Sequence, residues 1–451
     1  MLSRAFRASA TRTALALVVA CGCAPAPTGP QAERLILISV DTLRADHLGC
    51  YGYERPTSPN LDRLAAQGTL FEQASSTASW TVPAHMSMLT GQYARTHGID
   101  GWQKAPAGTE TIASVLQERG FATAAYVNVV LLNEQRGFER GFDEYHIVPQ
   151  AESPVGATNQ VLQAAIPWIE QHAGQPFFLF LHFYDVHSDY DPLPAYREAF
   201  VREYDGHVTG ETHQLRAYRK DRQREPWSEA DARHLIDLYD AGIRQFDDQI
   251  QPLLDFLERS GLAARTVVAL TSDHGEEFLE RGDVLHGRTL HQELVHVPLL
   301  LRGPGVPVGM RVPGNASLVD LMPTLLGLLG APVPEACEGI DLARVWRAGA
   351  DLQGRVVFAE ADKWLAQEPG NIRRAVRRGR FKLLYDHASG ARQVFDLGSD
   401  PRELRDLGGE QQALTKALWL ELETFLQGER DVEEVELSEI ELRELEALGY
   451  F

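Results

Sequence analysis

The sequence has 451 residues, which is enough for one large domain with a smaller appendage. Hydrophobic residues make up 44% and charged residues 24%, a balance that excludes a disordered or fibrous chain. The formal net charge of −20 argues against nucleic acid as a partner, because basic surfaces bind phosphate backbones, but an anionic substrate stays open because a bound metal ion can reverse the charge of one pocket.

The N-terminus has the pattern of a targeting segment. Three arginines precede a short apolar run: Arg4, Arg7 and Arg12. The run, ALALVVA at 14–20, is well short of the about 20 residues that span a bilayer, so we expect residues 1–20 to be a signal peptide. VVAC at 18–21 resembles the lipobox of bacterial lipoproteins, with Cys21 as the acylated residue and 21–33 as a Pro-rich tether.

An ordinary signal peptide with a chance cysteine is the alternative interpretation of this segment. Both interpretations predict an exported protein. The first predicts a bacterial lipoprotein anchored at Cys21 at the outer membrane, in the periplasm or at the cell surface, with the N-terminal lipid as its only membrane contact.

From residue 34 onward, apolar strand-like runs alternate with helical patterns. The predicted strands are 34–41, 121–127, 176–187, 266–277 and 297–306. The predicted helices lie in 58–74 with Gly68 as the stop signal, in the first part of 109–127, and in 228–261, which Gly261 ends. This alternation is typical of an α/β fold with a largely parallel central sheet sandwiched by helices, here over 34–345. Residues 205–227 are polar and without periodicity, which predicts a loop insertion that can lie over the pocket.

The sequence pattern changes after about residue 345. Short strands, turns and a helical pattern predict a smaller C-terminal α+β subdomain over 346–430. The tail 431–451 is acidic and amphipathic, and we expect it to pack as a terminal helix. Export would permit a disulfide between Cys50 and Cys337, but two cysteines in so long a chain make no framework, so their pairing stays open.

Side chains suited to chemistry follow three of these predicted elements. Asp41 ends the first strand, Asp273 and His274 follow a later strand, and Thr81 lies just before Pro83 at the start of a helical segment. Ligands gather at the carboxyl ends of parallel strands. Two carboxylates, an imidazole and a hydroxyl make a set of ligands for one divalent cation, and metal coordination is one way to activate a threonine hydroxyl.

Each of these residues also has a structural interpretation. Asp41 could be a turn residue, SDHGEE at 272–277 a solvated loop, and Thr81 a helix N-cap with Pro83 in the first turn. Any one of them alone favours the structural interpretation, but all of them at the ends of strand-like runs favour a site.

The sequence resembles the sulfatase family of the alkaline phosphatase superfamily. The resemblance rests on LILISVDTLRADHLGCYGY, TSPNLDRLAAQGTLFEQA, TVPAHMSMLTG, PFFLFLHFYDVHSDYDPL and LTSDHGEEFLERGDVLHGRTLHQELVHVPLLL, and it covers roughly 34–410. It implies that Asp41, Asp273 and His274 bind the metal. Thr42 stands where a second aspartate is usual, and Thr81-Val82-Pro83-Ala84-His85 stands where the family has Cys/Ser-x-Pro-x-Arg.

The threonine changes the expected chemistry. Sulfatases oxidise the Cys or Ser to formylglycine, whereas the same oxidation of Thr81 would give a ketone, so we expect no formylglycine. The Thr-x-Pro-x-His pattern is similar to that of nucleotide pyrophosphatase/phosphodiesterases, in which an unmodified threonine attacks phosphorus. The spacing of His274 and His286 looks like that of bacterial phosphoethanolamine transferases, which also use threonine. The resemblance therefore implies phosphate esters rather than sulfate esters as substrates.

Four further residues receive supporting roles from the resemblance. His187 matches a substrate-facing histidine that assists the leaving group, His286 lies where the family has a basic group near the transferred anion, and His85 replaces the arginine and contacts the same group. Asn128 is the substitute for a substrate-binding Lys-x-His stretch that this sequence lacks. For each lone histidine, a structural role is an equal alternative.

A single metal ion is predicted, because Asp185-Val186-His187 does not supply the Asp-x-x-x-His pair of two-zinc relatives. Ca, Zn or Mn is expected ahead of Mg, and the nitrogen ligand His274 favours Zn or Mn. The substrate is an ester of a small molecule, a glycan or a lipid headgroup.

Two rival hypotheses remain beside the phosphate-ester hydrolase. One is a sulfuric ester hydrolase that works without formylglycine. The other is a non-catalytic surface lipoprotein that retains the fold as a binding module.

Overall fold

The computed structural model describes residues 32–99, 101, 103–148, 158–221, 223–361 and 373–427. The predicted signal peptide 1–20, Cys21 with nearly all of the tether, and the predicted tail helix 431–451 lie outside the described residues. Within those residues, no helix has both the length and the apolar character that crossing a bilayer requires.

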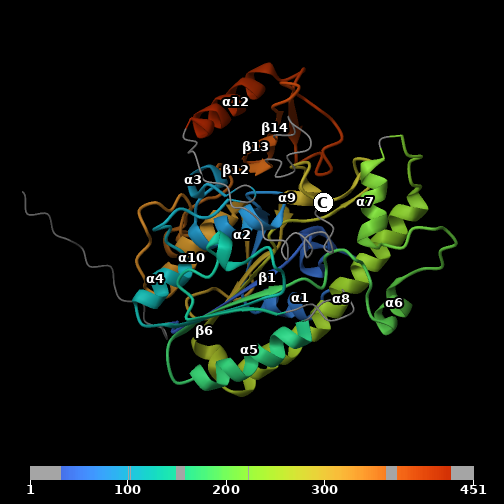
Figure 1. Cartoon of the computed structure of the whole chain (residues 1–451). Helices are drawn as coiled ribbons and strands as arrows, with labels where there is room; N and C mark the ends of the chain where they lie inside the picture. Colours follow the sequence, from blue (N-terminus) through green and yellow to red (C-terminus); the bar gives the residue numbers. More distant parts are fainter. Residues whose placement is uncertain are drawn as a thin grey trace, which may run out of the picture.

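A mixed sheet of nine strands lies at the centre of the described chain (Figure 1). Its order is β11-β2-β10-β6-β1-β5-β3-β4, and the short β9 pairs with β2. The strands are β1 (Arg34–Val40), β2 (Thr69–Ser75), β3 (Ala122–Val127), β4 (Glu144–Ile147), β5 (Phe177–Phe183), β6 (Thr266–Thr271), β9 (His296–Val297), β10 (Leu299–Arg302) and β11 (Met310–Ser317). β1 is parallel to β5 and β6, and β3 is parallel to β4 and β5, whereas β10 is antiparallel to β2 and β6. The predicted α/β fold with a largely parallel sheet is confirmed.

Helices cover both faces of the sheet. They are α1 (Pro59–Ala66), α5 (Thr158–His172) and α8 (Glu229–Arg259) on one face, and α2 (Thr81–Thr90), α4 (Ile112–Glu118) and α10 (Leu321–Leu328) on the other. Every residue of β1 is buried, and alternate side chains enter different cores. Ile36 and Ile38 pack on the α5–α8 side, whereas Leu35 and Leu37 pack on the α2 side. A strand buried on both faces reads as a continuous apolar run, which explains why it could be recognised from the sequence.

A second, four-stranded antiparallel sheet forms the C-terminal subdomain. It consists of β12 (Val356–Ala361), β13 (Arg373–Arg378), β14 (Phe381–Asp386) and β15 (Arg392–Asp396). The helix α12 (Gln412–Leu426) packs on one face of it, where Leu418 and Leu422 meet Val376 and Leu383. Figure 1 shows this unit above the strand ends of the central sheet.

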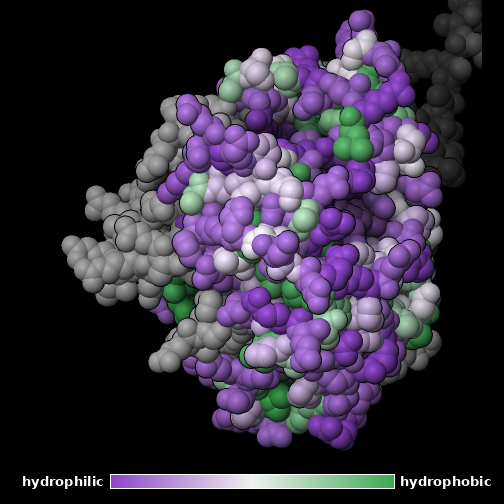
Figure 2. Space-filling view, turned by 90° about the vertical axis from the view of Figure 1, so that its right-hand side faces the viewer, coloured by the Kyte–Doolittle hydropathy of each residue, from purple (hydrophilic) through white to green (hydrophobic). Residues whose placement is uncertain are grey.

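Short elements connect these layers. The helices are α3 (Ala94–His97), α6 (Pro194–Phe200), α7 (Thr212–Lys220), α9 (Gln292–Val295) and α11 (Arg344–Ala348), and a two-stranded ribbon consists of β7 (Glu277–Phe278) and β8 (Val284–Leu285). Single 3₁₀ turns are η1 (Ala45–His47), η2 (Gly49–Tyr51), η3 (Glu134–Arg136), η4 (Leu262–Arg265) and η5 (Leu318–Asp320). The surface that carries α6 and α7 is mostly hydrophilic, as Figure 2 shows.

Three sequence predictions need correction. The interval 205–227 is not a plain loop, because it contains α7. Leu215 and Tyr218 are the buried hydrophobic residues of this helix, and too few apolar residues are present for a helical period to be visible in the sequence. The predicted strand 297–306 is two short strands, since Pro298 lacks the N–H that would continue the ladder. The strand predicted over 266–277 ends at Thr271. Cys50 and Cys337, whose pairing the sequence left open, are both free.

The junction between α1 and β2 gives a test of the packing. A Cβ atom on Gly68 would lie 2.0 Å from the carbonyl oxygen of Leu301 in β10, so Gly68→Ala must push two sheet strands apart. We expect the substitution to lower the free energy of unfolding by about 1–3 kcal/mol. Gly174→Ala is the matched control, because a Cβ there meets nothing within 4 Å, and it should change the free energy by less than about 0.5 kcal/mol. Urea unfolding of the two variants measures the difference, and equal stabilities would contradict the packing argument.

Candidate active site

Two carboxylates and one imidazole converge where the central strands end. Asp41 lies just past β1 and Asp273 just past β6, and these strands are parallel neighbours with Ser39 opposite Thr271. Their carboxyl ends therefore share one edge of the sheet. The Nε2 atom of His274 lies 3.3 Å from Asp273 Oδ2 and 3.6 Å from Asp41 Oδ1, and all three side chains are fully buried. The structure thus brings together the three predicted metal ligands.

The hydrogen bonds around Asp41, Asp273 and His274 leave ligand atoms available for a cation. His274 Nδ1 lies 2.8 Å from the carbonyl oxygen of Gly275, which can only accept, so Nδ1 carries the proton and the Nε2 lone pair faces the carboxylates. Asp41 Oδ1 and Asp273 Oδ2 are buried and accept no hydrogen bond from the described residues. Buried carboxylate oxygens without donors are costly unless a cation faces them, so this set of residues fits one divalent ion.

Thr81 completes the cluster as a hydroxyl. Its Oγ1 lies 3.4 Å from Asp41 Oδ2 and 3.4 Å from His274 Nε2. The N-cap of α2 is Trp80, so the interpretation of Thr81 as the N-cap is wrong. As the first helical residue, Thr81 is held at the positive end of α2, beside the N–H groups that lack partners within the helix.

Thr42 does not take the place of a second acidic ligand. Its Oγ1 donates to the carbonyl of Asp41 at 2.7 Å, and its backbone N–H donates to Asp273 Oδ1 at 3.3 Å. The backbone of Thr42 adopts φ +58°, a left-handed conformation that turns the chain sharply after β1. Thr42 therefore supports Asp273 through its backbone.

His85 lies behind the cluster, one helical turn after Thr81. Its Nδ1 donates to the Thr81 carbonyl at 2.8 Å and lies 3.5 Å from Asp273 Oδ2, and its Nε2 is 2.9 Å from Ser39 Oγ. The ring is fully buried, and burial lowers its pKa to about 4, so it is neutral. The expected contact between His85 and the transferred group is therefore corrected: both nitrogens are used inside the protein, and His85 is a positioning residue.

Sequence reasoning missed His182, which lies in β5 opposite Ser39. The backbone N–H of Asn128 donates to His182 Nδ1 at 3.4 Å, so in the neutral ring the proton is on Nε2, which lies 3.3 Å from Asp41 Oδ2. Burial lowers the pKa of His182 to about 4, which keeps it neutral. The protonated Nε2 of the neutral His182 ring therefore faces Asp41 without making a hydrogen bond to the described residues, and it offers no lone pair to a metal ion. Asn128, predicted to bind substrate, is buried and supports this histidine; its Nδ2 donates to the carbonyl of Val148 at 3.1 Å.

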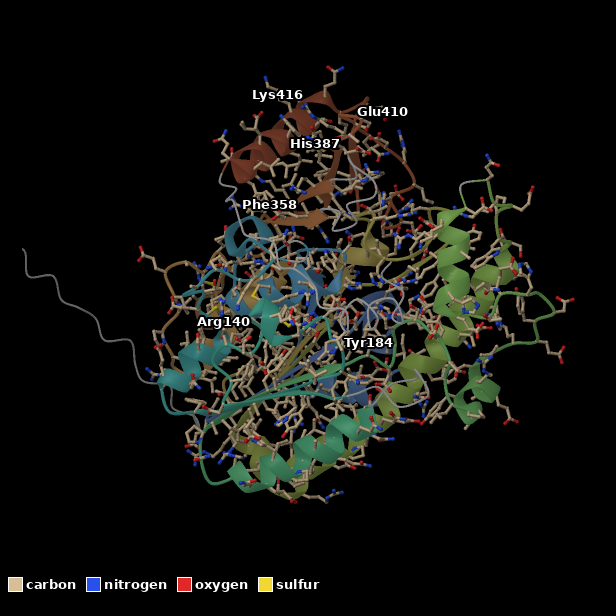
Figure 3. The ribbon with its side chains drawn as sticks, viewed as in Figure 1. Arg140, Tyr184, Phe358, His387, Glu410 and Lys416 are labelled. Atoms are coloured by element: carbon tan, nitrogen blue, oxygen red, sulfur yellow. The ribbon has the colours of Figure 1, made fainter. Side chains whose placement is uncertain are left out.

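Two further predicted histidines lie on the other side of His274. The rings of His274 and His286 are 4.3 Å apart, and those of His286 and His187 are 5.0 Å apart. His286 Nδ1 shares a hydrogen bond of 3.0 Å with Glu276, a second residue that the sequence did not single out. His187 Nδ1 donates to the carbonyl of Ser188 at 2.7 Å, and the hydroxyl of Tyr184 lies 3.0 Å from its Nε2. Tyr184 is labelled in Figure 3, directly after β5.

Burial shifts the titration of the three ligands. It raises the pKa of Asp41 to about 7, and the charge of His274 offsets only part of this. Burial and the charge of Asp41 raise the pKa of Asp273. Burial disfavours the charged form of His274, but the charges of Asp273 and Asp41 outweigh it and raise its pKa. Protons therefore compete with a divalent cation for these three side chains as the pH falls.

The family model of the sulfatases matches residues 33–331, and the model described as N-sulphoglucosamine sulphohydrolase, C-terminal, matches 283–428. The chain is 22% identical over 422 residues to the Delta 4,5-hexuronate-2-O-sulfatase of Bacteroides thetaiotaomicron, covering 85% of this chain and 86% of that protein. It is 24% identical over 442 residues to arylsulfatase K of Mus musculus, covering 86% and 78%.

Solved structures share the fold. One, determined in complex with its substrate D-glucosamine-2-N,6-O-disulfate, superimposes with a TM-score of 0.74 at 20% identity and covers 89% of this chain and 98% of that chain. The phosphonate monoester hydrolase of Agrobacterium radiobacter superimposes with a TM-score of 0.73 at 21% identity and covers 87% and 95%.

Metal binding should depend on pH in a defined direction. Mn²⁺ or Zn²⁺ should raise the melting temperature more at pH 8 than at pH 6, because at pH 6 Asp41 and His274 are below their raised pKa values and their protons compete with the metal. Differential scanning fluorimetry with and without chelator measures the shift. Asp41→Asn should abolish most of it, whereas Asp185→Asn, which alters a buried carboxyl outside the cluster, should retain it. Equal shifts at both pH values would contradict the proposed ligand set.

Proposed function

Because the chain belongs to the sulfatase family and is therefore an ester hydrolase, we propose that it cleaves phosphate esters with the unmodified hydroxyl of Thr81. The observation that carries the proposal is the position of Thr81 Oγ1, 3.4 Å from both Asp41 Oδ2 and His274 Nε2 at the start of α2. A threonine cannot become the aldehyde on which formylglycine chemistry depends, since its Cβ bears a methyl group. Its hydroxyl is a nucleophile only when something lowers its pKa.

The metal site supplies that activation. A divalent ion held by Asp41, Asp273 and His274 would, when bound, act as a Lewis acid that lowers the pKa of the Thr81 hydroxyl and neutralises charge on the ester. The positive end of α2 favours an anionic group beside Thr81. His182 and His85 lie beside the two carboxylates as neutral rings, 3.3 Å from Asp41 Oδ2 and 3.5 Å from Asp273 Oδ2.

Thr81 Oγ1 gives up its proton and forms a bond to phosphorus while the bond to the leaving oxygen breaks, and that leaving oxygen takes up a proton. The product is a phosphothreonine, whose Oγ1–P bond is then broken by water or by another acceptor. His286 uses only Nδ1 in its hydrogen bond with Glu276, and its ring lies 4.3 Å from that of His274, so we assign proton transfer with the leaving oxygen and the attacking water to His286. Both nitrogens of His187 have partners, the Ser188 carbonyl and the Tyr184 hydroxyl, so His187 is a positioning residue that packs against His286.

Sulfate-ester hydrolysis is the second candidate, and the sequence relatives favour it. Among them are a hexuronate-2-O-sulfatase at 22% identity and arylsulfatase K at 24%. The fold does not discriminate, since a protein bound to a disulfated glucosamine and a phosphonate monoester hydrolase superimpose equally well. A sulfated or phosphorylated glycan, or a lipid headgroup ester, would be accessible to an enzyme exported and anchored through Cys21, as we propose from the sequence.

Substitution of Thr81 tests the nucleophile. Thr81→Val keeps the shape of the side chain without the hydroxyl, and we expect kcat to fall at least about 10³-fold. Thr81→Ser keeps the hydroxyl and should retain measurable turnover. Intact-mass spectrometry of wild type incubated with 4-nitrophenyl phosphate should reveal one phosphoryl group on Thr81, and incubation with a phosphodiester should reveal one phosphoryl group that keeps its second ester; both adducts should be absent from Thr81→Val.

The products distinguish the rival functions. Release of sulfate but not of phosphate from paired esters would replace the proposal with the second candidate. Metal-loaded wild type that binds the esters without turning them over, with the same affinity as Thr81→Val, would instead establish a binding module. A formylglycine-type mass loss on wild type would contradict the unmodified threonine.

A further inference from the structure

The helix α7 places two arginines beside the active site. Leu215 and Tyr218 anchor the helix in the core, while Arg216 and Arg219, three residues apart, share a neighbouring flank. The helix packs against β8, and β8 leads directly into His286. Figure 1 shows α7 beside the segment that carries α9, and Figure 2 shows the hydrophilic face on this side of the molecule.

Three guanidinium groups lie around one carboxylate at this point. Asp283, just before β8, lies 2.9 Å from Arg288 Nη1, 3.4 Å from Arg224 Nη2 and 3.7 Å from Arg219 Nε. One carboxylate is thus shared by three cations, in a protein whose net charge is −20. Guanidinium groups held by packed side chains are the groups that bind anions with paired hydrogen bonds.

Two other acidic residues near Arg219, Glu276 and Glu277, have hydrogen-bond partners of their own. Glu276 shares its hydrogen bond with His286, and Glu277 Oε1 accepts from the backbone N–H groups of Arg281 and Asp283. Arg219 Nε is buried and makes no hydrogen bond with the described residues, and the whole side chain is only 14% exposed. A buried guanidinium donor without an acceptor points to a ligand that supplies one.

The arginines are close to the catalytic groups. The helix α7, which carries Arg216 and Arg219, contacts β8, and His286 directly follows β8. Arg288 is two residues after His286 on the same strand end. A group bound by Arg219 would therefore lie next to the side of the pocket where the leaving group departs.

We propose that Arg219, supported by Arg216 and Arg288, binds a second anionic group of the substrate, on the leaving-group side of the ester that is cleaved. The proposal rests on the proposed ester hydrolysis and specifies its substrate class: a saccharide ester that carries a carboxylate or a further sulfo or phospho group. A planar guanidinium pairs with the oxygens of either kind of group.

Three matched substrates test this: the 2-O-phosphate or 2-O-sulfate of a neutral hexoside, of the corresponding hexuronide, and of a hexoside with a second sulfate. In Arg219→Gln, KM for one or both of the doubly anionic esters should rise about tenfold or more with kcat retained, while KM for the neutral hexoside ester changes less than about twofold. The ester that responds identifies the second group as carboxylate or sulfate. Arg219→Lys should recover part of the loss.

Arg224→Gln is the control, because it removes an equal charge beside Asp283, but this side chain lies over the ring of Tyr218 and donates to the Gly282 carbonyl. It should leave all three KM values unchanged. An equal change for every substrate in Arg219→Gln, or the same selective change in Arg224→Gln, would overturn the proposal.

The proposed anion subsite can be tested even if the proposed ester hydrolysis is wrong. If metal-loaded wild type cleaves none of the esters, calorimetry of Thr81→Val protein with the same three compounds replaces kinetics. Weaker binding of only the doubly anionic compounds in the Arg219→Gln background would retain the anion subsite, and indifference to Arg219 would remove it. Melting temperatures of each variant establish that it is folded.

Discussion

Two carboxylates held together out of water are the constraint on which this site depends. Asp41 and Asp273 follow adjacent parallel strands whose register is set by their hydrogen-bond ladder, so the sheet itself fixes their separation. Bringing two negative groups together in a buried place is unfavourable unless protons or a cation neutralise them. Burial raises the pKa of Asp41, and burial together with the charge of Asp41 raises the pKa of Asp273, while Asp41 Oδ1 and Asp273 Oδ2 accept no hydrogen bond from the described residues.

The two histidines beside the carboxylates constrain the geometry of the site without adding charge. His182 and His85 are buried rings whose pKa values are lowered to about 4, so both are neutral; His182 Nε2 lies 3.3 Å from Asp41 Oδ2 and His85 Nδ1 lies 3.5 Å from Asp273 Oδ2. Their tautomers follow from fixed backbone partners, the N–H of Asn128 and the carbonyl of Thr81. A charged group in either place would compete with a metal ion for the same oxygens. Neutral supports leave the ligand oxygens available and still fix their orientation.

Features at strand ends could be predicted from the sequence, and features set by long-range packing could not. Asp41, Asp273 and His274 stand out because a polar residue directly after an apolar run marks the edge where parallel strands end. The sequence does indicate which way His182 points, since strand alternation puts it on the same face of β5 as Phe178 and Phe180, toward α2. One histidine inside an apolar strand is nevertheless indistinguishable from a satisfied core residue until the partner Asp41 is placed beside it.

The roles of His85 and α7 were beyond sequence patterns for a different reason. His85 matches a motif position, but motif spacing fixes only which turn of the helix it occupies, and the ring direction depends on Ser39 and Asp273 from distant strands. The segment containing α7 has too few apolar residues for a recognisable period. Its helix is stabilised by two buried side chains whose partners come from elsewhere in the fold.

The two departures from the family pattern at the base of the site compensate each other. Thr42 stands where a second aspartate is usual, which removes one negative charge, and His85 stands where an arginine is usual, which removes one positive charge because the buried ring is neutral. Both residues contact the same carboxylate: Thr42 donates its N–H to Oδ1 of Asp273, and His85 Nδ1 lies 3.5 Å from Oδ2. The net charge presented to a metal ion is therefore the same as with the usual pair. The site lacks the cation that would stabilise an aldehyde hydrate, and Thr81 cannot form such a hydrate. The residues at positions 42, 81 and 85 therefore fit together as one change of nucleophile.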